Sequence, residues 1–111
     1  MMKFKEGMTS KEKVEALERF ILVHSLLYYH MSESLITDSQ FDKAARLLVK
    51  KIKEYGPKKI ASTQYGYVFD DFDGSTGFYL IDALNKKDKK RIKQVANAVL
   101  RSYNRGGFCE V

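Results

Sequence analysis

One helix-start signal occurs twice in this sequence and limits the fold more than any other feature. Thr9 is followed three residues later by Glu12, and Thr37 by Gln40. In such a capping box each side chain accepts a hydrogen bond from a backbone N–H that the helix leaves free. Mostly apolar residues at helical spacing follow both boxes, first Val14, Ala16, Leu17, Phe20, Ile21, Val23, His24, Leu27 and Tyr28, then Phe41, Ala44, Ala45, Leu48, Val49, Ile52 and Tyr55. The pattern predicts helices over roughly residues 10–30 and 38–55.

The ends of these helices are also marked. Gly56 and Pro57 follow the second helix, as a left-handed glycine C-cap and a residue that cannot continue a helix. Residues 31–36 alone separate the two helices. So short a connection favours antiparallel packing.

The second half of the chain has a weaker pattern. Periodicity is lost over residues 58–75, where 65-YGYVF-69 is aromatic enough for a short strand or a packed loop. Ser75 can cap a short helix that runs through Phe78, Ile81 and Leu84. A final helix is marked by Ile92, Val95, Ala96, Val99, Leu100 and Tyr103 and is closed by Gly106-Gly107.

These elements predict a mainly α protein, a small bundle of about four helices with a short irregular or strand-like segment near residues 65–69. The chain has 111 residues, 44% of them hydrophobic, which allows one modest core. We therefore expect residues 1–111 to form a single domain. No apolar run has the length of a signal peptide or a membrane span, so we expect a cytoplasmic protein with no membrane partner.

Positive charge is concentrated in one segment. Residues 86–105 hold eight Lys or Arg against Asp88, whereas the formal net charge of the whole chain is +6. Such a segment can attract nucleic acid or an acidic protein surface, or it can be a solvated helix face. The candidate contact residues are Lys86, Lys87, Lys89, Lys90, Arg91 and Lys93.

The sequence contains no convincing catalytic set. The stretch 71-DFDGST-76 is similar to the signature of phosphatases with an aspartyl nucleophile, but that chemistry needs a parallel sheet, and the residues that follow have a helical pattern. A calcium loop would need an oxygen ligand at position 69, which is Phe. One late cysteine, Cys109, and two histidines form no triad or metal site, and His24 is expected to be a core imidazole. We expect no enzyme and no metal.

The most informative stretch joins the first two helices. Helical spacing places Asp38, Phe41 and Asp42 on the first turn of the second helix, and Tyr28 and Tyr29 end the first. If these side chains converge, they form a pocket suited to a flat cation, through ring contact and charge-assisted hydrogen bonds. The same carboxylates also stabilise a helix start by themselves.

The run 28-YYHMSESLITDSQFDKAARLL-48 resembles the small N-terminal helical domain of bacterial NAD-dependent DNA ligases, whose pattern is Tyr-aromatic or His, a short turn, and Asp-x-x-Tyr-Asp. The resemblance covers about residues 10–56. The chain is also similar to the stand-alone, ligase-related small proteins of phages and bacteria. It implies that Tyr28 stacks on a nicotinamide ring, that Tyr29 stands beside it, and that Asp38 and Asp42 contact the carboxamide and ribose. Phe41 departs from the pattern because the family has Tyr there.

We therefore expect a non-catalytic binding module related to the ligase domain, with nicotinamide mononucleotide (NMN) or NAD as a ligand and no required cofactor. One alternative is a phage-encoded interaction protein that docks on a host enzyme or defence complex, since one charged face and an aromatic cluster suit such a role. A second alternative is nucleic-acid binding through the basic final helix.

Overall fold

The computed structural model describes residues 6–70, 72, 74 and 79–104. Its elements are α1 (Ser10–His30), α2 (Asp38–Tyr55), two 3-10 helices η1 (Pro57–Ser62) and η2 (Gly66–Val68), α3 (Leu80–Ala83) and α4 (Lys86–Asn104). Within the described ranges there are four α-helices and no strand, which confirms the predicted mainly α class. The expected cap Ser75, Phe78, the closing Gly106-Gly107 and Cys109 lie outside the described residues.

Both predicted capping boxes are present. The backbone N–H of Glu12 donates to Thr9 Oγ1 at 3.1 Å, and the Thr9 N–H donates to Glu12 Oε1 at 3.1 Å. At α2 the N–H of Gln40 donates to Thr37 Oγ1 at 3.1 Å, and the Thr37 N–H donates to Gln40 Oε1 at 2.8 Å. Because these bonds join residues three apart, sequence alone is enough to locate both helix starts.

The end of α2 differs in one detail from the prediction. Gly56 has a positive φ of 119°, but its ψ of 115° lies outside the left-handed helical region. The chain therefore turns out of α2 in a more extended conformation, and Pro57 begins η1 instead of a loop. Proline is well placed there, since the first position of a helix needs no N–H donor.

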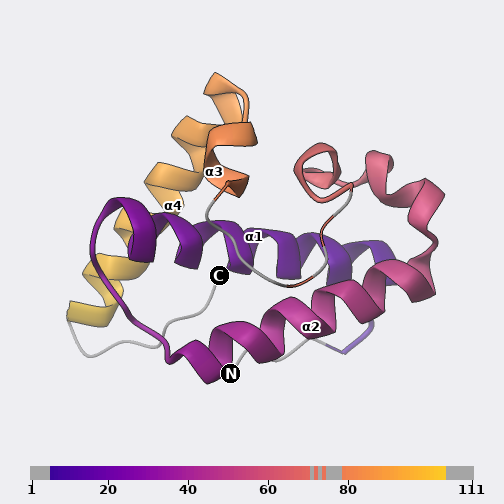
Figure 1. Ribbon diagram of the computed structural model, residues 1–111, viewed down its shortest axis with the longest axis horizontal. Coiled ribbons are helices and arrows are strands. Elements are labelled where there is room, and N and C mark those ends of the chain that lie inside the picture. The colour runs from indigo at the N-terminus through magenta and orange to yellow at the C-terminus, as the bar shows by residue number, and fades with distance from the viewer. Residues whose placement is uncertain (1–5, 71, 73, 75–78, 105–111) are drawn as a thin grey trace.

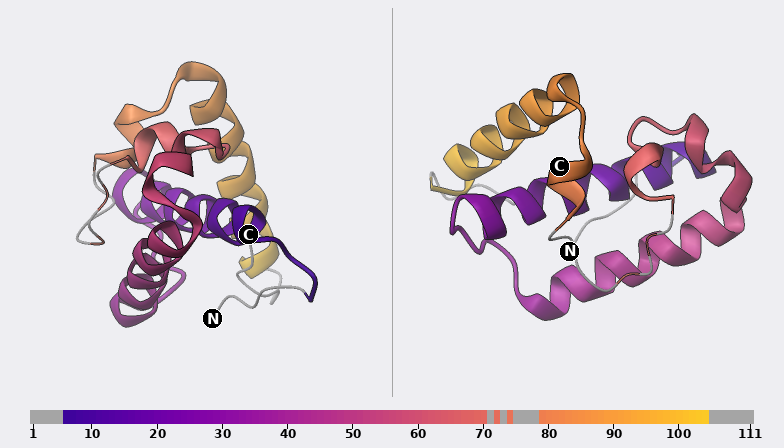
Figure 2. Two further views of the ribbon diagram at one scale, coloured as in Figure 1. Left: turned by 90° about the vertical axis from the view of Figure 1, so that its right-hand side faces the viewer. Right: turned by 45° about the horizontal axis from the view of Figure 1, so that its top comes forward.

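Helix α1 lies at the centre of the fold. Helix α2 runs antiparallel beside it, as the short connection predicts, and α4 packs on another side of α1 (Figures 1 and 2). Every residue from Phe20 to Leu27 is buried, because α1 has neighbours on several sides. Among the described residues no helix has the length and apolar character needed to cross a membrane.

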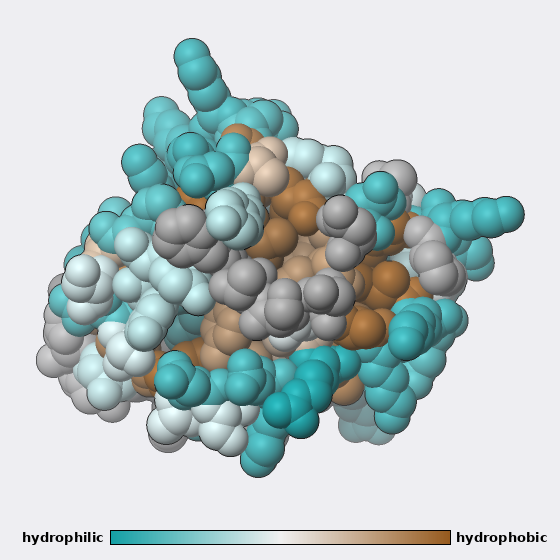
Figure 3. Space-filling view, viewed as in Figure 1, coloured by the Kyte–Doolittle hydropathy of each residue, from teal (hydrophilic) through white to brown (hydrophobic). Residues whose placement is uncertain are grey.

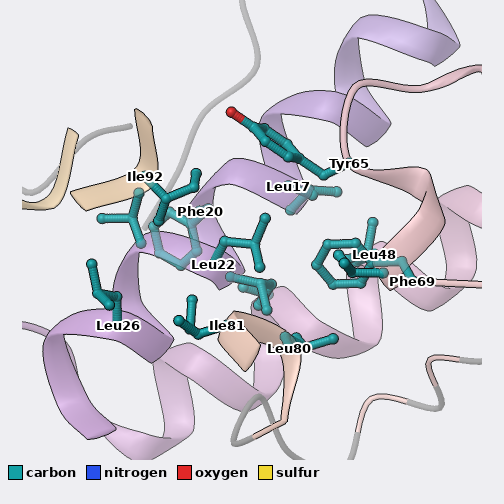
Figure 4. Close-up of a cluster of buried hydrophobic side chains, with 14 of the residues drawn as sticks. Leu17, Phe20, Leu22, Leu26, Leu48, Tyr65, Phe69, Leu80, Ile81 and Ile92 are labelled. Atoms are coloured by element: carbon teal, nitrogen blue, oxygen red, sulfur yellow. The ribbon is translucent and has the colours of Figure 1, made fainter. Parts of the chain in front are cut away.

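The core collects side chains from every described element. Leu17, Phe20, Leu22 and Leu26 of α1 lie against Leu48 of α2, Tyr65 and Phe69 beside η2, Leu80 and Ile81 of α3, and Ile92 of α4 (Figure 4). On the face of Figure 3, hydrophilic side chains cover the edges formed by α2 and α4, and hydrophobic ones show between them. This distribution agrees with the sequences: α2 and α4 are amphipathic, with apolar residues on one face, whereas α1 has an apolar stretch from Phe20 to Leu27 interrupted only by His24 and Ser25.

The aromatic segment 65–69 is not a strand. Its centre is the 3-10 helix η2, which packs on η1, and Gly66 makes this approach possible. A Cβ at position 66 would lie 1.7 Å from the carbonyl oxygen of Ile60 and 2.6 Å from Thr63 Oγ1. The strand-like alternative is therefore not confirmed, because the segment folds back on itself instead of pairing with another strand.

Candidate functional site

A pocket of about 330 Å³ opens where α1 ends and α2 begins. This size is at the lower end of the range of about 300–1,000 Å³ that small-molecule sites occupy. All five residues singled out in this region line it, together with His24 and the connection between the helices. The lining residues are His24, Tyr28, Tyr29, Glu33, Ser34, Leu35, Ile36, Thr37, Asp38, Phe41 and Asp42.

Tyr28 and Tyr29 supply the aromatic wall. Their ring centroids are 4.9 Å apart and the ring planes are nearly perpendicular, at 88°. The side chains remain 50% and 38% exposed, although α1 is buried over the two turns before them. The rings thus contact each other at the edge of the core, and part of their surface is exposed on the side of the pocket.

The chain reverses direction directly after these rings. The N–H of Met31 donates to the carbonyl of Leu26 at 3.2 Å, and that of Glu33 donates to the carbonyl of Leu27 at 2.8 Å. Ser32 has a positive φ of 54°, which is uncommon for a residue other than glycine. These bonds end α1 and direct residues 33–37 along the pocket towards α2.

The capping box of α2 places the two acids. With Thr37 fixed as N-cap, Asp38 is the first helical residue, and Asp42 follows it one turn later on the same side of α2. Phe41 and Asp42 are partly buried, whereas Asp38 is exposed. Asp38 alone lies in the first turn of α2, so it can stabilise the helix start as well as line the pocket, whereas Asp42 lies one turn further along the helix than expected and lines the pocket.

His24 forms the inner wall of the pocket. It is 3% exposed, and its ring centroid lies 4.5 Å from that of Phe20. Burial lowers its pKa from 6.5 to about 4, so the imidazole is neutral at pH 7. His24 is buried, as expected, but it also borders the pocket. Its position one turn before Tyr28 is the sequence signal for this second role.

The pocket has further lining residues that sequence reasoning missed. Glu33, Ser34, Leu35 and Ile36 come from the connection between the helices. The Ser34 hydroxyl donates to the carbonyl of Ile36 at 3.0 Å, which holds this segment in a local turn. No periodic pattern marks such a segment, so its contribution becomes visible only once the helices are packed.

The six candidate basic residues lie in the first half of α4. Lys86, Lys87, Lys90, Arg91 and Lys93 are exposed and Lys89 is partly buried. Lys89 and Lys93 also border a second hollow of about 520 Å³, whose other lining residues are Leu26, His30, Met31, Ile81, Asp82 and Asn97. The exposed basic residues are therefore available to an anionic partner, and Lys89 and Lys93 line a hollow that also contains apolar side chains.

A hydrogen-bonded network fixes the start of α4. The Tyr67 hydroxyl donates to Asp88 Oδ2 at 2.6 Å and accepts the N–H of Asn85 at 3.1 Å. Asn85 also accepts the Asp88 N–H at 2.8 Å through Oδ1. This network connects η2 to α4, and it includes Asp88, the acidic residue among the lysines at the start of α4.

Comparison of the chain with protein-family models, curated protein sequences and solved structures finds no match. The likeness to the ligase domain therefore stays a prediction based on the residues of the 28–48 run. Among the described residues, no group of three or more His, Cys, Asp or Glu side chains is placed to hold a metal ion. Asp71, Asp73, Ser75 and Thr76 of the phosphatase-like stretch lie outside the described residues.

Proposed function

We propose that this chain is a non-catalytic module that binds a nicotinamide nucleotide, NMN or NAD, in the pocket between α1 and α2. One observation carries the proposal: the five residues that the ligase resemblance assigns to the ligand all line this pocket. They are Tyr28, Tyr29, Asp38, Phe41 and Asp42.

The chemistry of these side chains suits the nicotinamide half of such a ligand. The ring of nicotinamide in NMN or NAD is flat and carries a positive charge, which the face of a tyrosine attracts. Carboxylate oxygens of Asp38 and Asp42 accept hydrogen bonds from a carboxamide or from ribose hydroxyls. Phe41 keeps ring contact but has no hydroxyl, so we expect weaker binding than a tyrosine there would give.

A titration with NMN tests the proposal. Backbone amide shifts of the purified chain are recorded as NMN is added, and perturbations are expected around residues 28–42. Asp42→Asn should weaken binding about tenfold to a hundredfold, because a charge-assisted hydrogen bond contributes about 1.5–3 kcal/mol. Tyr28→Ala should weaken it by a similar factor. Shifts that stay unchanged in residues 28–42 at millimolar NMN would reject this function.

Matched variants separate loss of binding from loss of structure. Tyr103→Ala removes a tyrosine that is 46% exposed on α4, and Asp70→Asn neutralises an exposed acid; neither residue lines the pocket. Both should keep the affinity of the parent chain. Thermal unfolding of all four variants verifies that the binding variants are still folded.

A second candidate function is binding of nucleic acid through α4. Two observations favour it. Five basic residues of α4 are exposed, namely Lys86, Lys87, Lys90, Arg91 and Lys93, and Lys89 and Lys93 line the second hollow. Contacts to phosphates release counterions, so affinity should fall steeply with salt concentration.

An oligonucleotide binding assay across a salt series tests this candidate. Lys89→Gln/Lys93→Gln should weaken binding and flatten the salt dependence by about two counterions. Lys50→Gln/Lys53→Gln removes two exposed lysines of α2 and is the control of equal charge change. Equal effects of the two pairs would indicate non-specific attraction, and binding that is absent at low salt would exclude the function.

A further inference from the structure

The pocket between α1 and α2 has a one-sided charge. Its described lining contains three acidic side chains, Glu33, Asp38 and Asp42, and no lysine or arginine. The imidazole of His24, which also lines the pocket, is buried against Phe20 and adds no positive charge at neutral pH. A ligand in this pocket therefore meets carboxylates, aromatic faces and hydroxyl groups among the described residues, and no cationic side chain there that could form an ion pair with a phosphate.

Among the described lining residues, the start of α2 supplies a partial positive charge that favours an anion. A helix N-terminus carries roughly half a positive charge, and Thr37 and Asp38 border the pocket. Two of the N–H groups there are already engaged, since Gln40 donates to Thr37 Oγ1 and Thr37 donates to Gln40 Oε1. Half a charge does not balance the three carboxylates of the described lining, so the local field favours cations.

We propose that the pocket selects a flat organic cation, specifically the pyridinium nucleoside part of a nicotinamide nucleotide, and leaves any attached phosphate outside in solvent. This inference rests on the proposed function and specifies which part of the ligand is recognised. Nicotinamide riboside carries one positive charge and no phosphate, whereas NMN adds a phosphate with up to two negative charges. The aromatic wall attracts the ring of both, and the three acids disfavour the phosphate of the second.

Four ligands separate these contributions when each is titrated into the full chain at low ionic strength. They are nicotinamide riboside, NMN, 1-methylnicotinamide, which is a cation without ribose, and neutral nicotinamide. We expect nicotinamide riboside to bind about fivefold or more tightly than NMN, and 1-methylnicotinamide to bind more tightly than nicotinamide. Both differences should shrink as salt is raised, because salt screens exposed charges.

One variant tests the charge of the wall directly. Glu33→Gln keeps the size of an exposed side chain that lines the pocket and removes one negative charge. It should reduce the difference in affinity between nicotinamide riboside and NMN, mainly because NMN binds more tightly. Glu54→Gln, near the far end of α2 and outside the pocket, is the matched control and should leave both affinities unchanged.

The outcomes distinguish this inference from the function on which it rests. Tighter binding of NMN than of nicotinamide riboside would overturn the inference and leave the proposed function intact. Equal affinity for nicotinamide and 1-methylnicotinamide would remove the preference for a cation. If none of the four ligands binds, the proposed function and the inference fail together.

Discussion

Thr63 Oγ1 lies 2.7 Å from Glu18 Oε2, and both side chains are buried although 45 residues separate them in the chain. The same hydroxyl lies 2.6 Å from the carbonyl oxygen of Ile60. A hydroxyl has one proton and donates to one acceptor at a time. If Glu18 is protonated, its own O–H can donate to Thr63, which then donates to Ile60, and every group is satisfied.

This pair belongs to a larger contact between α1 and the segment after η1. The N–H of Tyr65 donates to Glu18 Oε1 at 3.3 Å, and the N–H of Gln64 donates to Glu15 Oε2 at 2.8 Å. Two acids one turn apart on α1 thus accept from successive backbone N–H groups. Burial raises the pKa of Glu18 from 4.5 to about 7, and the hydrogen bonds from Thr63 and Tyr65 offset part of this rise.

The raised pKa of Glu18 predicts a dependence of stability on pH. The folded state binds this proton more tightly than the unfolded state, so the stabilisation is complete below pH 4.5 and is lost as pH rises to about 7. Between about pH 5 and pH 7.5 the loss amounts to about 2 kcal/mol. Denaturant unfolding of the parent chain and of Glu18→Gln at these two pH values measures it. A difference between the two chains that does not vary with pH would contradict the prediction.

His24 should have the opposite dependence. Burial lowers its pKa to about 4, so the unfolded state binds this proton more tightly, and stability is lost as pH falls from about 6.5 to 4. This effect, also about 2 kcal/mol, should offset most of the Glu18 effect in the parent chain near pH 5. The free energy of unfolding of His24→Gln, relative to that of the parent chain, should therefore be more favourable at pH 5 than at pH 7.5. A parallel shift at both pH values would show that His24 does not titrate differently in the two states.

Gly66 should tolerate no side chain. In Gly66→Ala the new Cβ would overlap the carbonyl of Ile60, which is backbone and cannot rotate away. We expect a loss of about 3 kcal/mol or more, because η2 must move off η1. Gly7→Ala is the control: nothing lies within 4 Å of its Cβ, and its φ of 84° adds backbone strain alone. That strain should amount to about 1 kcal/mol. Similar losses in the two variants, measured by chemical denaturation, would argue against the close approach at Gly66.

Two neighbouring tyrosines should respond oppositely to loss of their hydroxyl. Tyr65 is fully buried, and its hydroxyl has no hydrogen-bond partner among the described residues. Removing it in Tyr65→Phe relieves an unsatisfied polar group and should keep or raise stability, by up to about 1 kcal/mol. Tyr67→Phe instead removes the bonds to Asp88 and Asn85 and should lower stability by about 1 kcal/mol. Thermal unfolding measures the stability of both variants. If Tyr65→Phe loses as much stability as Tyr67→Phe, the buried hydroxyl of Tyr65 has a hydrogen-bond partner.

The sequence by itself determined the first two helices and their starts. Thr9 and Glu12, like Thr37 and Gln40, lie three residues apart, and their reciprocal bonds form in any chain that begins a helix there. The apolar spacing behind them is equally local, so the predicted ranges 10–30 and 38–55 agree with α1 and α2. The same locality placed Asp38 and Asp42 on one side of α2.

The tertiary structure decided everything that depends on distant partners. Glu18 is one of several acids in the sequence, and its burial follows from Thr63 and Tyr65 folding onto it. The aromatic segment became η2 because Gly66 packs on Ile60. The pocket itself required α1 and α2 to lie antiparallel, which brought the tyrosines at the end of one helix to the acids at the start of the other. Local hydrogen bonds and periodicity are encoded within a few residues, whereas burial and cavity shape arise only when separate helices pack together.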